Sequence, residues 1–479
     1  MVKILRPLLR LLSIAGVWLG ISDSCVIAQE LSLFDLVKNG DVEAVEQLLK
    51  SRIDVNIDEP DGATALHWAA YLDDLEMVQS LVRSGADVNA ANDYGVTPLT
   101  LACGNASDAV VRFLLGTGAD PNSLVWSGET VLMTCARTGA YDAVNTLLQA
   151  GASVNSVEPE EHQTALMWAV SERHFGVARE LVSWGATVDA RSKRGFTPLL
   201  FAAREGDIES ARLLLAAGAN PNDSAFDGTS ALVVATVRGH TTLAIFLLEA
   251  GADPNHAGRG YSALHWASGL WETELTGVAG IAVERDEEWR SLAGIQTEKT
   301  KLVRALLEYG AHIDSRVKQS PRFIGFGGRG EIVGATPFFL AAMAADVPLM
   351  RLLVEYGADP HRRNLGNVNS LMVAAGLGRR ARQSSVSSDR SLAAAKFVWN
   401  WAGGDMNAVS DAGDTAVHGA ANSGSPELVQ FLVDNGAAVD VANNRGTTPL
   451  MVAAGTEVEG LLRELVKDAN VSAATRVGR

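Results

Sequence analysis

Apolar residues in this chain occur in short groups with helical spacing, separated by polar turns. Within residues 74–82, apolar side chains stand at positions 75, 78, 81 and 82, which lie on one face of a helix. Residues 64–70 form a second apolar group that begins with Thr64, and a threonine here can cap a helix with its side-chain oxygen. The pattern therefore predicts two short helices, each with one buried face.

This pair of groups recurs about every 33 residues, marked by the phrase Thr-x-Leu-x-x-Ala. Twelve clear or weaker copies begin at Leu31, Thr64, Thr97, Thr130, Thr164, Thr197, Ser230, Ser262, Thr336, Asn369, Thr415 and Thr448. Their spacing is 32 to 34 residues except for two intervals of 74 and 46. Such a period indicates a repeat array.

A second phrase keeps the same period and follows each predicted second helix. In Gly85-Ala-Asp-Val-Asn89, the glycine suits the left-handed conformation that ends a helix, and residues 89–95 suit a projecting hairpin. One unit is too small to bury its own apolar face, so neighbouring units are expected to stack.

The two phrases resemble those of the ankyrin-repeat family over nearly the whole chain. The resemblance implies an all-α solenoid of about twelve repeats over residues 29–467, with a tail at 468–479. It also implies that partners bind the concave face and the hairpin tips. His67 and His265 occupy the family's histidine position, where they are expected to bridge the turns of adjacent repeats.

The two long intervals contain insertions. We expect one insert near 270–300 and another at 379–391, both between the two helices of a repeat, the second a basic loop. A further insert at 317–335 falls within a hairpin and is expected to project beside the concave face.

The N-terminus predicts export. Lys3, Arg6 and Arg10 precede an 11-residue apolar stretch, which is typical of a signal peptide and too short to span a bilayer. We predict cleavage after Ala28, giving a periplasmic or extracellular protein; an uncleaved anchor is the alternative.

Composition narrows the class of protein. The 479 residues are 47% hydrophobic and carry a net charge of −16, which argues against a disordered chain and against nucleic acid as a partner. No apolar run of the mature chain approaches the roughly 20 residues of a membrane span. Oligomeric state cannot be inferred from these features.

The sequence contains few catalytic or metal-binding patterns. Residues 325–330 match Gly-x-Gly-x-x-Gly but lie in a hairpin insert without the strand and helix that a dinucleotide site needs. Glu284 and Glu288 are interleaved with arginines, as on a solvated helix. We therefore expect no catalytic residue, cofactor or metal site. Cys103 and Cys135 are predicted to be free thiols, because helix layers about 10 Å apart exceed the disulfide limit of about 7 Å between Cα atoms.

Aromatic and basic residues in the hairpins are the candidate partner-binding residues. Large aromatic side chains in exposed segments resemble the anchors of protein interfaces, although folding back onto a neighbouring hairpin is an equal alternative. Basic hairpins on an acidic protein further suggest an acidic patch on the partner. The candidates are Tyr94, Trp126, Arg194, Phe196, Phe226, Arg259, Tyr261, Phe323, Phe326, Arg329 and Arg362.

These features favour a non-enzymatic scaffold that binds a protein partner in the cell envelope or outside the cell. One alternative is a secreted hydrolase or carbohydrate-binding module that uses the acidic insert or the exposed aromatics. Another is a secreted effector that acts on host proteins.

Overall fold

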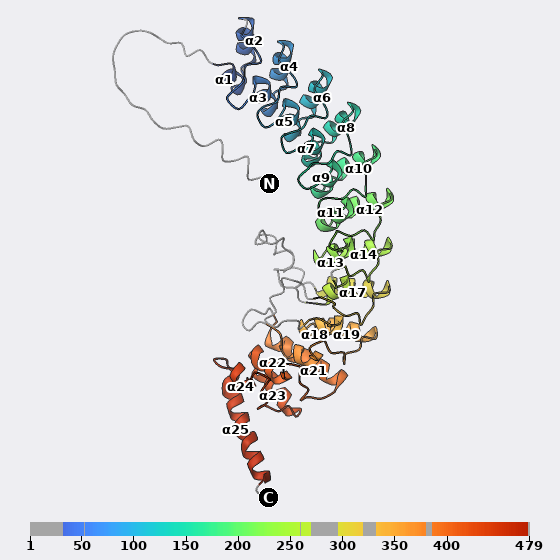
Figure 1. Ribbon diagram of the computed structural model, residues 1–479, viewed down its shortest axis with the longest axis vertical. Helices are drawn as coiled ribbons and strands as arrows, with labels where there is room; N and C mark the ends of the chain where they lie inside the picture. Colours follow the sequence, from blue (N-terminus) through green and yellow to red (C-terminus); the bar gives the residue numbers. More distant parts are fainter. Residues whose placement is uncertain are drawn as a thin grey trace, which may run out of the picture.

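The computed structural model describes residues 32–51, 53–258, 260–269, 296–319, 332–379 and 386–477. Within these ranges the chain consists of helices joined by turns, with isolated β-bridges and no strand. The all-α solenoid predicted from the sequence is confirmed here, because consecutive helices pack side by side into one curved stack (Figure 1).

The helices form two rows. The inner row, on the left in Figure 1, contains α1 (Leu33–Lys38), α3 (Ala65–Tyr71), α5 (Pro98–Gly104), α7 (Val131–Thr138), α9 (Ala165–Ser171), α11 (Pro198–Glu205), α13 (Ala231–Val237), α15 (Ala263–Ser268), α18 (Pro337–Met343), α20 (Ser370–Ala374), α22 (Ala416–Ser423) and α24 (Pro449–Val452). The outer row contains α2 (Val42–Lys50), α4 (Leu75–Arg83), α6 (Asp108–Gly116), α8 (Tyr141–Gln149), α10 (Phe175–Ser183), α12 (Ile208–Ala216), α14 (Thr241–Glu249), α17 (Gln296–Glu308), α19 (Val347–Glu355), α21 (Ser388–Ala402), α23 (Pro426–Asp434) and α25 (Val458–Val477).

Side-chain caps mark where the helices begin. Thr97 accepts a hydrogen bond from the Thr100 amide at the start of α5, and Pro98 follows at a position that needs no amide hydrogen. Asp74 caps the outer helix α4 in the same way by accepting from the Met77 amide. The start of each helix is therefore fixed by residues of its own repeat and does not depend on contact with another repeat.

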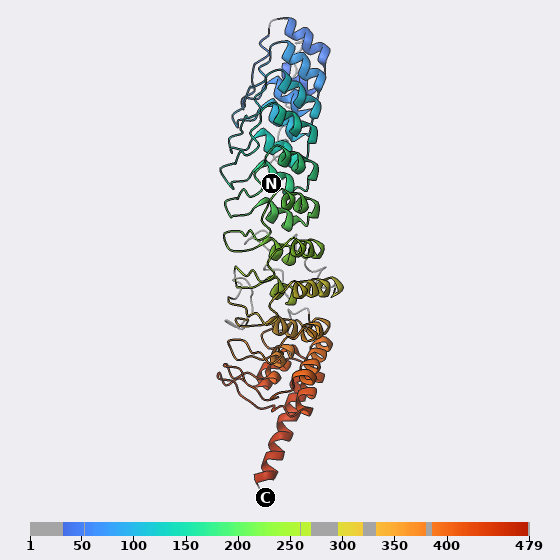
Figure 2. The ribbon, with the colours of Figure 1, turned by 90° about the vertical axis from the view of Figure 1, so that its right-hand side faces the viewer.

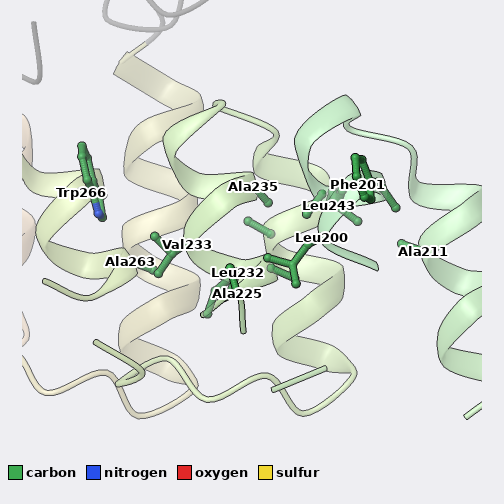
Figure 3. Packing of buried hydrophobic residues seen from close by; sticks show 14 of the residues in the cluster. Leu200, Phe201, Ala211, Ala225, Leu232, Val233, Ala235, Leu243, Ala263 and Trp266 are labelled. Carbon is green, nitrogen blue, oxygen red and sulfur yellow. The ribbon is translucent and has the colours of Figure 1, made fainter. Parts of the chain in front are cut away.

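The core lies between successive helix pairs. Each inner helix contacts the next inner helix, and outer helices likewise contact their neighbours along most of the stack. Leu200, Leu232 and Val233 show how side chains from consecutive inner helices meet between the two rows (Figure 3). Because the core runs along the stack rather than closing into a globule, each repeat depends on its neighbours for burial.

A pair of small residues lets the inner helices approach closely, and this contact overturns the prediction of free thiols. Cys103 and Cys135 take the places that alanines take in most repeats, and they form a disulfide with Cα atoms 4.6 Å apart. The prediction used the distance between helix axes. Cα atoms on the facing sides of two helices lie closer by about two helix radii of roughly 2.3 Å each, which brings them within disulfide range.

Three buried histidines link repeats along the stack. The Nδ1 atom of His67 accepts from the Thr64 amide at 3.0 Å, so Nε2 carries the hydrogen and donates to the Val96 carbonyl at 2.9 Å. His265 bridges Ser262 and Ser315 in the same way, as the family resemblance implied. His418 makes the equivalent bridge and was missed from the sequence because its repeat start is weak. Burial lowers the pKa of His67 and lowers the pKa of His265 to about 4.

An asparagine ladder accounts for the second recurring phrase. Each of these asparagines donates its side-chain amide to a glycine carbonyl of the following repeat and accepts from a nearby backbone amide there. The Asn255 to Gly310 bond, at 2.9 Å, spans the first insert, so stacking continues across it. The ladder consists of Asn56, Asn89, Asn122, Asn155, Asn222, Asn255 and Asn407.

The insertions fall at the ends of described helices. The first lies between α15 and α17. Helix α21 begins at Ser388, inside the insert predicted at 379–391, so the last residues of that insert are helical and not loop. Two backbone hydrogen bonds close the base of the hairpin insert: Val317 donates to the Ala335 carbonyl, and Gly334 donates to the Val317 carbonyl. Helix α25 runs without a break past residue 467, where the sequence predicted the array to end.

Basic side chains join the repeats that flank the insertions. Arg379 donates to the carbonyls of Met343 and Ala374, and Lys299 donates to the Gly269 carbonyl and lies 3.6 Å from a carboxylate oxygen of Asp346. Burial lowers the pKa of Lys299 and lowers the pKa of Arg379 to about 10. These residues satisfy carbonyls at the ends of inner helices.

Candidate protein-binding surface

The hairpins project from one side of the helices as a row of loops (Figure 2). Backbone hydrogen bonds join the tips of neighbouring hairpins: Trp126 donates to the Tyr94 carbonyl at 2.9 Å, and Phe226 donates to the Arg194 carbonyl at 3.1 Å. Similar bonds join further tips, for example Leu365 to Val333. The tips therefore form a surface whose backbone is fixed by the stack.

Three of the predicted aromatic residues are exposed on this surface. Trp126 is 82% exposed, Phe226 is 72% exposed and Tyr94 is 52% exposed. The rings of Tyr94 and Trp126 meet edge to face, with centroids 6.3 Å apart. Leu365 is 68% exposed at an equivalent tip and was not predicted, because only aromatic and basic residues were candidates. Large apolar side chains on a rigid backbone are suited to anchor a partner.

Phe196 and Tyr261 are placed differently. Both are half-buried, and each packs edge to face on an aromatic ring of the inner helix that follows it. Phe196 contacts Phe201 with centroids 5.7 Å apart, and Tyr261 contacts Trp266 with centroids 5.0 Å apart. Their rings thus help to fix the hairpins against the helices.

The two basic candidates that the structure describes, Arg194 and Arg362, differ in whether they form ion pairs within the protein. Arg194 is exposed at a hairpin tip. Arg362 lies 3.3 Å from a carboxylate oxygen of Asp314 and 3.5 Å from one of Asp359. Exposed pairs of this kind contribute little to stability, so Arg362 can exchange these partners for others.

Cations cover aromatic rings on the inner helices, and these contacts were not predicted from the sequence. Lys38 lies 3.9 Å above the ring of Trp68 and pairs with Glu59, which also accepts from the Trp68 indole. Arg137 lies over Trp168 and Arg204 over Phe201 in similar fashion. The sequence does contain a signal for these contacts: each of the three cations stands seven residues after a repeat start, at Leu31, Thr130 or Thr197.

Four of the candidate binding residues lie outside the described residues: Arg259, Phe323, Phe326 and Arg329. The same holds for Glu284, Glu288, the loop 325–330 and the predicted cleavage site at Ala28.

Among the residues that are described, no group of three His, Cys, Asp or Glu side chains is placed to hold a metal ion. None of the described helices has both the length and the apolar character of a membrane span.

Comparison with known proteins agrees with the repeat geometry. A family model for three ankyrin repeats matches residues 33–125, 111–192, 132–225, 199–273 and 385–475, and a single ankyrin-repeat model matches residues 333–365. Among solved structures, the human ASB11 ankyrin repeat domain is 27% identical, with a TM-score of 0.39. The match covers 42% of this chain and 90% of that domain.

The family models match well over half of the chain, and the matched residues include the phrases that form the inner helices and the asparagine ladder. Ankyrin repeats indicate a scaffold for protein–protein interaction. The chain belongs to the ankyrin-repeat family.

Proposed function

We propose that this protein is a non-enzymatic scaffold that holds a protein partner against its hairpin tips and the adjoining inner-helix face. The observation that carries the proposal is the exposure of Trp126 and Phe226 on backbone that neighbouring hairpins hold in place. Anchoring side chains on a rigid surface bind with little ordering cost, which favours recognition of a folded or extended polypeptide.

Affinity capture tests the proposal. Tagged wild-type protein is used to recover partners from the native envelope fraction, in parallel with the triple variant W126A/F226A/L365A. We expect the triple variant to recover at least about tenfold less of the main partner, because a few apolar anchors carry most of the binding energy at an interface. Its helical content should match that of the wild type.

Trp184 supplies the matched control. It is 44% exposed but lies at the end of outer helix α10, on the opposite row from the inner helices. Trp184→Ala should recover the same partner in the same amount as the wild type. Equal recovery by the triple variant and the wild type would contradict binding at the tips.

We further propose that the protein works after export, in the periplasm or outside the cell. The disulfide between Cys103 and Cys135 supports this, because disulfides persist in oxidising compartments and are rare in the cytosol. Mass spectrometry of the protein from its native source should give an N-terminus at Gln29 and an intact Cys103–Cys135 bridge. An N-terminus at Met1 with free thiols would contradict export.

A further inference from the structure

Negative charge is concentrated on the first four hairpins. Their residues 51–63, 84–96, 117–129 and 150–163 include eleven carboxylates, no lysine and one arginine, Arg52. The charge changes sign at the fifth hairpin, where Lys193 and Arg194 occupy the tip. The basic hairpins that suggested an acidic partner therefore begin with the fifth hairpin.

Part of this charge is used within the fold. Glu158 is buried and accepts from the backbone amides of its own turn, while Glu59 and Glu129 pair with Lys38 and Arg137. Three carboxylates at the hairpin tips remain exposed. These are Asp61, Asp93 and Glu160.

The exposed Tyr94–Trp126 pair lies among these carboxylates. Asp93 adjoins Tyr94 in sequence, and its amide donates to the Asp61 carbonyl of the preceding tip at 2.9 Å. On the other side, the ring of Pro159 lies against Gly128, which places the Glu160 turn beside the Trp126 hairpin. Within the part of the chain that the structure describes, none of the three carboxylates forms an ion pair, and the Lys193 ammonium of the fifth hairpin donates to the Glu160 backbone carbonyl at 3.1 Å.

We propose that Asp61, Asp93, Tyr94, Trp126 and Glu160 form an acidic aromatic edge that binds a basic, arginine-bearing polypeptide segment. This inference rests on the proposed scaffold function and adds the chemistry of the partner. A guanidinium group can lie on the exposed face of an indole or phenol ring and donate to a carboxylate at the same time. A purely apolar segment would leave the negative charge of the carboxylates without a partner, and an acidic segment would be repelled by that charge.

Binding of short charged peptides tests the inference. Fluorescently labelled octa-arginine, octa-lysine and octa-glutamate are titrated with the full chain at about 50 mM and about 200 mM salt. We expect octa-arginine to bind most tightly, octa-lysine more weakly and octa-glutamate not at all. Binding of octa-arginine should weaken with salt, since the edge attracts it by charge.

Variants locate the binding. Y94A/W126A and, separately, D61N/D93N/E160Q should each weaken octa-arginine binding at least about fivefold. Trp184→Ala is the matched control, because Trp184 is also an exposed aromatic residue but lies at the end of outer helix α10, away from the hairpin tips. It should leave the affinity unchanged. All substituted side chains are exposed, and an unchanged circular dichroism spectrum checks that the variants fold.

Two results would overturn the inference: octa-arginine binding that none of the edge variants weakens, or equal weakening by Trp184→Ala. If either is found while the triple variant W126A/F226A/L365A still loses its partner, the scaffold proposal stands and only the basic chemistry of the partner is wrong. If partner capture is also unaffected, both proposals fail.

Discussion

Cys103 and Cys135 are joined by a disulfide that links inner helix α5 to inner helix α7. Both side chains are fully buried, at repeat positions that hold alanine elsewhere, for example Ala70 in α3 and Ala102 in α5. The bridge therefore fixes two neighbouring repeats at the point where their helices approach most closely.

Replacing both cysteines with alanine should destabilise this interface without changing the fold. C103A/C135A removes a cross-link between residues 32 apart, for which loop-closure entropy gives an effect of about 3–4 kcal/mol. We expect faster amide hydrogen exchange in α5 to α8 and unchanged helical content. Reduction of the wild type should reproduce the effect, and the double variant should not respond to reductant.

Acidification should weaken the repeat interface at His265. Burial lowers its folded pKa to about 4, below the unfolded value near 6.5, so the unfolded chain binds the extra proton more readily. The contribution of His265 to the free energy of unfolding is therefore fully present above about pH 6.5. It falls by about 2–3 kcal/mol as the pH is lowered towards 4.

Urea unfolding of wild type and His265→Met between pH 7 and pH 4.5 measures this loss. Methionine occupies the same position in other repeats, at Met133 and Met167, so it suits the site and does not titrate. The stability difference between the two proteins should shrink as pH falls. A difference that stays constant across this range would contradict the assignment to His265.

Asn122→Asp should weaken one step of the asparagine ladder. The carboxylate can still accept from the Ser153 amide but cannot donate to the Gly151 carbonyl, which the Asn122 amide reaches at 3.1 Å. We expect a loss of about 1–2 kcal/mol in urea unfolding at pH 7. Stability equal to that of the wild type would mean that the ladder contributes nothing at this position.

Gly195→Ala should disturb the hairpin that presents Phe226. Gly195 has φ of +82°, and a Cβ atom there would lie 2.6 Å from the Phe226 backbone nitrogen. Gly85→Ala is the control, since Gly85 has φ of +93° but open space around the added atom. Both changes incur the cost of a left-handed conformation, about 1 kcal/mol or more. Gly195→Ala should lower the free energy of unfolding more than Gly85→Ala does. Equal losses of stability in the two variants would show that the close contact between Gly195 and Phe226 is unimportant.

The repeat architecture could be predicted because its causes are local. Threonine or serine caps, small residues in inner helices and glycines after outer helices recur at one period, and each acts within its own repeat or the next. The hairpin aromatics could be found for the same reason. Exposure follows repeat position, which the sequence analysis did not separate. Phe196 directly precedes its repeat start and packs on Phe201, whereas Phe226 stands four residues before its start and is exposed.

Features that depend on the distance between neighbouring backbones were missed. The Cys103–Cys135 bridge needs the true separation of facing Cα atoms, which the repeat period does not give. The cations over Trp68 and Trp168 likewise depend on how far a side chain reaches into the next repeat. Such contacts are set by the stacking geometry rather than by the sequence of any single repeat.

Photo-crosslinking tests binding at the hairpin tips most directly. A photoreactive phenylalanine analogue is placed in turn at positions 126, 226 and 184 of the full chain in its native cell, and crosslinked products are identified by mass spectrometry. The scaffold proposal predicts that positions 126 and 226 crosslink to the same partner polypeptide and that position 184, on an outer helix, does not. Crosslinks formed only from position 184 would contradict it.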